Sequence, residues 1–250
     1  MCAQSARFFV PFFVWLCLGS LGLIALAFNQ DVNALRALGV LPDMPDNVVR
    51  LLIVVQPFIL LVAGIGAGVA FGDRVELRSW VTARLRGDPP PLMQLSGLAL
   101  AALVGFGTGA VVVVLDRVFA PWIGLPSVAS LPDIGTALMA ISYGGITEEL
   151  MLRYGLMTLL VWVGARVWTT LPPGLYFGAL LVSAVLFGAG HLPAMAALIP
   201  LTPVVILRTV GLNALLGLAF GWLFWRRGLE HAMVAHIATH VAFWALAFAL

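Results

Sequence analysis

Long apolar stretches separated by short polar loops constrain this chain more than any other feature. A helix that crosses a bilayer needs about 20 mainly apolar residues. Most of the stretches reach this length, and two of them, 154–170 and 174–190, are short. The sequence therefore predicts an all-α fold, a polytopic transmembrane bundle of about eight hydrophobic helices. The predicted helices cover residues 8–28, 50–71, 92–114, 134–152, 154–170, 174–190, 203–225 and 229–250.

The composition indicates one integral membrane domain over residues 1–250 rather than a soluble protein with an anchor. Of its residues, 62% are hydrophobic and 10% are charged, whereas a soluble domain carries about 25% charged residues. A net charge of +2 without a basic tract excludes a nucleic-acid partner. Cys2 and Cys17 are too few for a disulfide framework or a cysteine-ligated zinc site.

Arginines in the loop after the second apolar stretch predict how the chain is oriented. Under the positive-inside rule this loop lies in the cytoplasm, as does the N-terminus with Arg7. We expect a multi-pass protein of the cell membrane, in particular a prokaryotic cytoplasmic membrane. If all eight stretches span, Arg226 and Arg227 lie outside; if 154–170 lies in the interface, they return to the cytoplasm. The loop arginines are Arg74, Arg78, Arg84 and Arg86.

Three ionisable residues, Glu148, Glu149 and Arg153, follow closely on one another inside an apolar region. Each charge near the bilayer centre costs about 2.5–3.5 kcal/mol, so such groups indicate a functional site. Glu149 and Arg153 are four residues apart and can pair on one helix face. Glu148 points about 100° away from Glu149 on an α-helix, which leaves it free for chemistry.

All four histidines, His191, His231, His236 and His240, lie in the last 60 residues. His236 and His240 share one helix face, and we expect His231 to form an interfacial charge pair with Glu230. A buried carboxylate can take a proton from water as the water attacks a carbonyl. Imidazoles can hold that water and stabilise the oxyanion. The combination suits peptide-bond hydrolysis inside a membrane cavity.

Other intramembrane protease designs fit poorly. The chain has no His-Glu-x-x-His motif for a zinc site. Ser96-Gly97 lacks the flanking pattern of a nucleophile elbow. Gly72-Asp73 has no second intramembrane Asp as a partner.

Three motifs follow one another along the chain: Glu148-Glu149-x-x-x-Arg153, Phe187-x-x-x-His191 and His236-x-x-x-His240. Their order and spacing resemble the CAAX protease and bacteriocin-processing family, and the run 213–229 is also similar. The resemblance covers about residues 134–245, which we expect to be the catalytic core. It implies a multi-helix intramembrane protease; the prenyl-protein members of the family cleave a tripeptide from prenylated C-termini.

Carried over by motif, the resemblance implies that Glu148 is the general base and that His191 helps to position the water. His236 and His240 would form the oxyanion site. At the last position the family usually has Asn or Asp, but a neutral His can donate a hydrogen bond much as Asn does. Four further residues would support the site: Glu149, Arg153, Phe187 beside His191, and Asn213 as a contact between helices.

Straight spans do not obviously bring these residues to one depth in the bilayer. Glu148 lies about 14 residues into its stretch, at ~1.5 Å per residue, whereas His191 ends another. We therefore expect broken, tilted or re-entrant helices, with Gly144-Gly145 and Gly190 as the places for a break.

The favoured mechanism needs no cofactor, because Glu148 can act without a metal. The alternative is a zinc ion held by His191, His236 and His240, if the three converge. The expected partners are the lipid bilayer and a peptide or protein substrate, lipidated or not.

Two other functions stay open at this point. One is a non-catalytic peptide-binding, immunity or scaffold membrane protein of the same fold. The other, a proton-coupled transporter, ranks last, because the chain shows no clear inverted repeat with paired broken helices.

Overall fold

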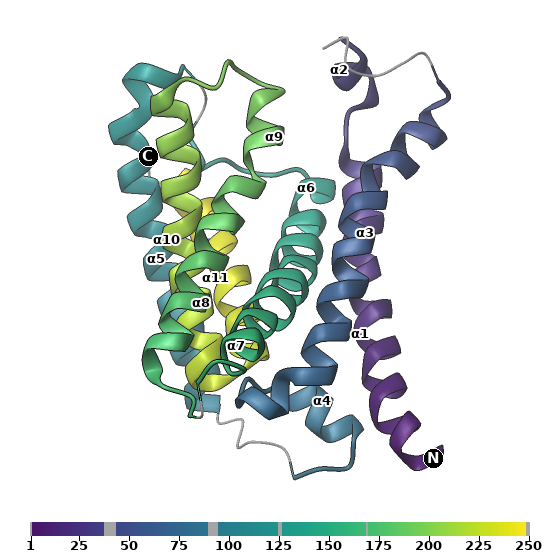
Figure 1. The fold of residues 1–250 in the computed structure, drawn as a ribbon. Helices are drawn as coiled ribbons and strands as arrows, with labels where there is room; N and C mark the ends of the chain where they lie inside the picture. The colour runs from purple at the N-terminus through teal and green to yellow at the C-terminus, as the bar shows by residue number, and fades with distance from the viewer. Residues whose placement is uncertain (1, 38–43, 90–94, 125–126, 169, 249–250) are drawn as a thin grey trace.

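The computed structural model describes residues 2–37, 44–89, 95–124, 127–168 and 170–248. These residues form helices joined by loops, with no strand among them, so the predicted all-α fold is confirmed. Figure 1 shows the long helices running between the two ends of a bundle. Outside 134–164 these are α1 (Cys2–Asn29), α3 (Asp46–Phe71), α5 (Leu95–Ile123), α8 (Pro173–Gly190), α10 (Pro203–Arg227) and α11 (Leu229–Ala247). Short helices connect them: α2 (Val32–Ala37), η1 (Gly72–Val75), α4 (Trp80–Leu85) and α9 (Leu192–Ala196).

The outer surface of the bundle is apolar along several helices. Large side chains such as Ile59, Leu103 and Val114 are 60%, 71% and 64% exposed. A soluble protein does not present extended apolar surface of this kind to water. The chain is therefore a multi-pass membrane protein. Among the described residues, five helical segments are long and apolar enough to cross a membrane: Ser5–Asn29, Asp46–Val75, Gly97–Ile123, Pro173–Ala196 and Pro203–Arg227.

Residues 134–164 form one continuous helix, which we call the 134–164 rod. It is built from α6 (Ile134–Met139), η2 (Ala140–Glu148), η3 (Leu150–Met157) and α7 (Thr158–Gly164). Both η2 and η3 are π-helical, with i→i+5 hydrogen bonding, a rare form that is often found at functional sites. The sequence predicted two helices here, 134–152 and 154–170, separated at Arg153. The structure has one helix instead, because Arg153 is buried and the helix continues through it.

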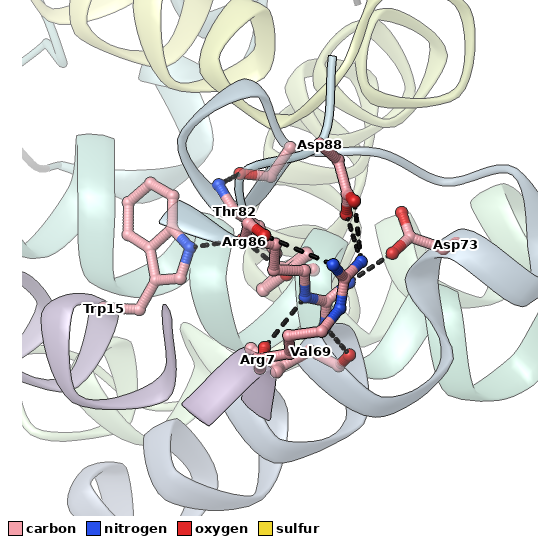
Figure 2. Close-up of polar contacts among 9 residues, drawn as sticks. Arg7, Trp15, Val69, Asp73, Thr82, Arg86 and Asp88 are labelled. Atoms are coloured by element: carbon pink, nitrogen blue, oxygen red, sulfur yellow. Dashed lines mark hydrogen bonds and ion pairs between the residues drawn. The ribbon is translucent and has the colours of Figure 1, made fainter. Parts of the chain in front are cut away.

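Arg86 ties three segments together at one end of the bundle (Figure 2). Its guanidinium donates to the Arg7 carbonyl at 3.0 Å and to the carbonyl of Val69, and it pairs with Asp73. Arg7 in turn pairs with Asp88 at 2.6 Å. These bonds hold the start of α1, the end of α3 and the residues after α4 at the same end.

The start of α11 is fixed to the same loop. The Leu229 amide donates to the Arg78 carbonyl at 3.1 Å. The Glu230 carboxylate accepts from the first amides of α4, from Trp80 and Val81, at 3.0 Å each. The expected pairing of Glu230 with His231 is not among the hydrogen bonds and ion pairs of the described residues. Glu230 serves to join α11 to α4.

This arrangement removes the conflict over the arginines that end α10. With one rod in place of two helices, the chain crosses the bundle once between 134 and 164. Arg226 and Arg227 then lie at the end that holds Arg7 and Arg78, as the bond between Leu229 and Arg78 requires. In Figure 1 the N-terminus, α4 and α7 share this end, and α2 and α9 lie at the other.

α1 and α3 pack against one side of the 134–164 rod at backbone distance. A Cβ atom on Gly64 of α3 would lie 2.9 Å from the Leu150 carbonyl oxygen and 3.0 Å from the Met151 Cα atom. From the rod, Thr147 Oγ1 donates to the Gly19 carbonyl of α1 at 2.7 Å. Other parts of the rod contact α8, α10 and α11. The polar residues of the rod therefore meet the motif residues of the C-terminal helices.

We predict that Gly64→Ala lowers the free energy of unfolding relative to Gly66→Ala, by about 1–3 kcal/mol, the usual cost of overpacking. Both substitutions make the same change inside α3, but a Cβ on Gly66 would find its nearest neighbour, a Phe12 ring atom, at 4.0 Å. Thermal unfolding of both variants in one detergent checks this. Equal melting temperatures would contradict the close packing of α3 on the rod.

Candidate active site

A buried carboxylate, Glu149, lies at the centre of the polar cluster. Glu149 Oε1 is 3.1 Å from Arg153 Nη1 and 2.8 Å from His236 Nδ1. Glu149 and Arg153 are 0% and 1% exposed, and His236 is 4% exposed. The predicted pairing of Glu149 with Arg153 is confirmed, and the bond to His236 extends it. The rod and α11 are thus joined by one carboxylate oxygen.

Arg153 is held by aromatic rings as well as by charge. Its guanidinium carbon lies 4.6 Å from the ring centre of Phe187 on α8 and 5.3 Å from that of Phe220 on α10. Among the described residues its nitrogens make no hydrogen bond, so the contact with Glu149 is an ion pair. A cation over aromatic faces gains about 2 kcal/mol or more when it is desolvated. Arg153 therefore connects the rod to α8 and α10.

A glycine on α10 gives Arg153 its space. A Cβ on Gly217 would lie 2.9 Å from the Ala184 Cα atom and 3.1 Å from Arg153 Nη2. Gly217 therefore lets α10 pack closely against α8. The same glycine leaves room for a guanidinium.

His236 and His240 form a row of imidazoles on α11. The His236 ring stacks on Phe220 at 4.5 Å and on His240 at 5.3 Å between ring centres. Both rings face Gly144 of the rod, where a Cβ would lie 3.3 Å from His236 Nε2 and 2.9 Å from His240 Nε2. His240 Nε2 is buried without a hydrogen-bond partner in the described part of the chain. Two imidazole nitrogens therefore lie close against the backbone of the rod at Gly144.

Glu148 lies beside the His236 imidazole, and its side chain is 14% exposed. Its closest polar contact to the imidazoles runs from Oε2 to His236 Nε2, over 3.9 Å. This distance is too long for a direct hydrogen bond and is one that a single water can bridge. Glu148 makes no hydrogen bond within the described residues, whereas Glu149 is fully engaged at Oε1.

His191 stands at the end of α8, next to Phe187. The two rings meet edge to face at 4.9 Å, and Phe187 also lies 5.9 Å from the His236 ring. His191 Nδ1 is 2.8 Å from the Phe187 carbonyl. α8 ends at Gly190 after 18 residues, and α9 continues the same apolar segment from Leu192. The break expected at Gly190 is confirmed, whereas the rod passes through Gly144-Gly145 as a π-helix without breaking.

Among the described residues, Asn213 does not form the expected hydrogen bond between helices. Its Nδ2 donates to the Thr209 carbonyl at 2.8 Å, within α10.

Sequence reasoning assigned no role to Phe220, which touches both Arg153 and His236, and it treated Gly144 only as a possible break. Phe220 lies between Gly217 and Gly221, in the run that resembles the family; that position is the one signal that pointed to it.

Across the described ranges, no group of three or more His, Cys, Asp or Glu side chains gathers closely enough to hold a metal ion. Nδ1 of His191 faces a carbonyl and Nδ1 of His236 faces Glu149, which leaves one free nitrogen on each ring. A three-His ligand set for zinc would need these side chains to move together.

The fold and the cluster define a polytopic membrane protein with a glutamate–arginine–histidine site inside its helix bundle. Residues 130–242 match the family model described as type II CAAX prenyl endopeptidase Rce1-like. The resemblance seen in the motifs is thereby confirmed over residues 130–242, the part of the chain that matches the CAAX protease family. No curated protein and no solved structure matches the chain.

We predict that Arg153→Met destabilises the protein by about 3–5 kcal/mol, because it leaves the buried Glu149 charge unpaired. Arg166→Met is the matched control: Arg166 is exposed and also lies over a ring, that of Trp162, at 4.2 Å. Its loss costs only about 0.5–1 kcal/mol. Unfolding in detergent measures both variants. The double variant Glu149→Gln/Arg153→Met should regain part of the loss; a double variant as unstable as the sum of both singles would refute the pairing.

Proposed function

We propose that this protein is an intramembrane endopeptidase in which Glu148 activates the attacking water. The single observation that carries the proposal is the unequal use of two adjacent carboxylates. Glu149 is paired with Arg153 and bonded to His236, whereas Glu148 makes no hydrogen bond and no ion pair with an arginine among the described residues. A general base must be free to accept a proton, and Glu148 meets this condition.

In the proposed reaction, a water between Glu148 and the imidazoles attacks the carbonyl carbon of the scissile peptide bond. The water gives one proton to the Glu148 carboxylate as its oxygen bonds to carbon. The carbon–nitrogen bond of the tetrahedral intermediate then breaks, and the proton passes from Glu148 to the leaving amine. The family pattern assigns the positioning of the water to His191 and the oxyanion to His236 and His240. No step needs a metal.

The proposed substrate is a protein or peptide whose C-terminus carries a prenylated cysteine. The family description supports this class, and the substrate's lipid would keep the peptide at the bilayer. The arginines at one end of the bundle support an orientation in the cell membrane with that end, and the N-terminus, in the cytoplasm. We propose that the substrate reaches the site from the bilayer or the cytosolic side.

We predict that Glu148→Gln lowers the rate of peptide cleavage by about 10²–10⁴-fold, the usual contribution of a general base. The assay uses protein in liposomes and a fluorogenic peptide ending in a farnesylated Cys-aliphatic-aliphatic-X sequence. Glu76→Gln serves as the control, because Glu76 is an exposed glutamate in the loop after η1.

Equal cleavage by Glu148→Gln and the wild type would remove Glu148 from the mechanism. If the wild-type protein cleaves neither the farnesylated peptide nor its unlipidated form, the non-catalytic alternative takes the place of the endopeptidase.

We also predict that EDTA and 1,10-phenanthroline leave the cleavage rate unchanged, because the proposed base acts without a metal. Metal analysis of the purified protein accompanies the assay. Loss of activity on chelation, with recovery on adding Zn²⁺, would replace this mechanism by one with zinc at the histidines.

A further inference from the structure

The bond between Glu149 and His236 determines where the imidazole carries its proton. Glu149 Oε1 lies 2.8 Å from His236 Nδ1, a normal hydrogen-bond distance. An ionised carboxylate can only accept, so Nδ1 must be the donor. Glu149 is ionised in its pair with Arg153, at 3.1 Å. A neutral His236 therefore carries its one proton on Nδ1 and a lone pair on Nε2.

The burial of the cluster favours a neutral ring. Glu149 and Arg153 already balance each other, and both are buried. A second proton on His236 would add a charge to a site with almost no access to water, which is costly unless a partner compensates it. Among the described residues, the further anion near Nε2 is Glu148, whose Oε2 lies 3.9 Å away, too far for a hydrogen bond that would fix a proton on Nε2.

The packing of His236 keeps Nε2 directed at Gly144 and Glu148. Its ring stacks on Phe220 and on His240, with angles of 22° and 17° between the planes. With Nδ1 bonded to Glu149, Nε2 faces Gly144 and Glu148. Glu148 Oε2 and His236 Nε2 are then two acceptors 3.9 Å apart. One water can give a hydrogen to each, which leaves its oxygen lone pairs free for attack.

We propose that Glu149 is a positioning residue that holds the proton of His236 on Nδ1 and so makes Nε2 an acceptor for the attacking water. His236 then holds the water together with Glu148 and does not donate to the oxyanion, in contrast to the role that the family pattern gives it. The hydrogen bond to the oxyanion comes instead from His240. Its buried Nε2 also lies near Gly144 and has no partner among the described residues. In the reaction His236 keeps its Nδ1 proton, and the proton lost by water goes to Glu148. This inference rests on the proposed function for its catalytic meaning, but the tautomer is a property of the protein alone.

The tautomer can be read directly by ¹⁵N NMR of the histidine-labelled protein in liposomes. The chain has four histidines, and the His236 signals are those missing from His236→Asn. We expect a protonated Nδ1 and an unprotonated Nε2 in the wild type. A proton on Nε2 alone, or on both nitrogens, would overturn the inference. This reading needs no substrate, so it decides the tautomer even if the protein cleaves neither probe and the proposed function fails.

The variant test compares Glu149→Gln with Glu230→Gln. A glutamine side chain can turn its amide group toward His236 Nδ1 and favour the other tautomer. We expect Glu149→Gln to shift the His236 signals toward a protonated Nε2. We also expect it to lower kcat on the farnesylated peptide by about 10²–10⁴-fold, with KM changed far less. Glu230 also accepts part-buried hydrogen bonds, but from α4, so Glu230→Gln should leave the tautomer and kcat as they are.

A Glu149→Gln protein with wild-type tautomer and wild-type kcat would overturn the positioning role. If this variant does not fold, the wild-type ¹⁵N spectrum and the Glu149→Asp variant decide. Glu149→Asp keeps a carboxylate, so where it folds it should keep the Nδ1 proton of His236 and recover more kcat than the glutamine does. Glu149→Asp with a protonated Nε2 would contradict the inference.

Discussion

The ion pair between Glu149 and Arg153 is the interaction on which the rest of the structure depends. Two opposite charges are buried inside a helix bundle, where neither could remain alone. Each then recruits neighbours: Glu149 accepts from His236 on α11, and Arg153 lies over Phe187 and Phe220 on α8 and α10. Four helical segments are thereby fixed around one pair. The pair thus sets the position of His236, Phe187 and Phe220 relative to the rod.

A second polar system holds the other side of the same segment. Tyr154, directly after Arg153, shares a hydrogen bond of 2.8 Å with Thr82 of α4, and Trp15 of α1 donates to Thr82 at 2.9 Å. Glu230 joins α4 to the start of α11. The helix that carries His236 is therefore anchored twice, once at the bundle end through Glu230 and once inside through Glu149. Such double anchoring keeps an imidazole in one orientation without a rigid covalent link.

The sequence predicted those features that depend on one helix at a time. Apolar length gave the all-α membrane bundle, and the four-residue spacing gave the pair of Glu149 and Arg153. It did not predict that 134–152 and 154–170 join, because an arginine in an apolar run looks the same whether it ends a helix or is buried. It also assumed 3.6 residues per turn where the rod is π-helical.

Contacts between helices were harder to foresee. The bond from Glu149 to His236 joins residues 87 positions apart, and Phe220 belongs to none of the motifs with ionisable groups. Their meeting depends on how far each helix is rotated and displaced, which spacing along one chain does not specify. Gly144 was visible as a small residue, but its role beneath two imidazoles appears only once α11 lies across the rod.

The backbone contact between Gly64 and the rod has a consequence for modularity. The matched family region starts at residue 130, after α1, α3 and α5. Yet Gly64 of α3 lies on the backbone of Leu150, and Gly105 of α5 lies on that of Ala235. The earlier helices are therefore not an appended module. Their backbones lie directly against those of the matched region. A substitution that adds bulk on one side therefore requires a compensating change on the other, and the two parts are constrained to diverge together.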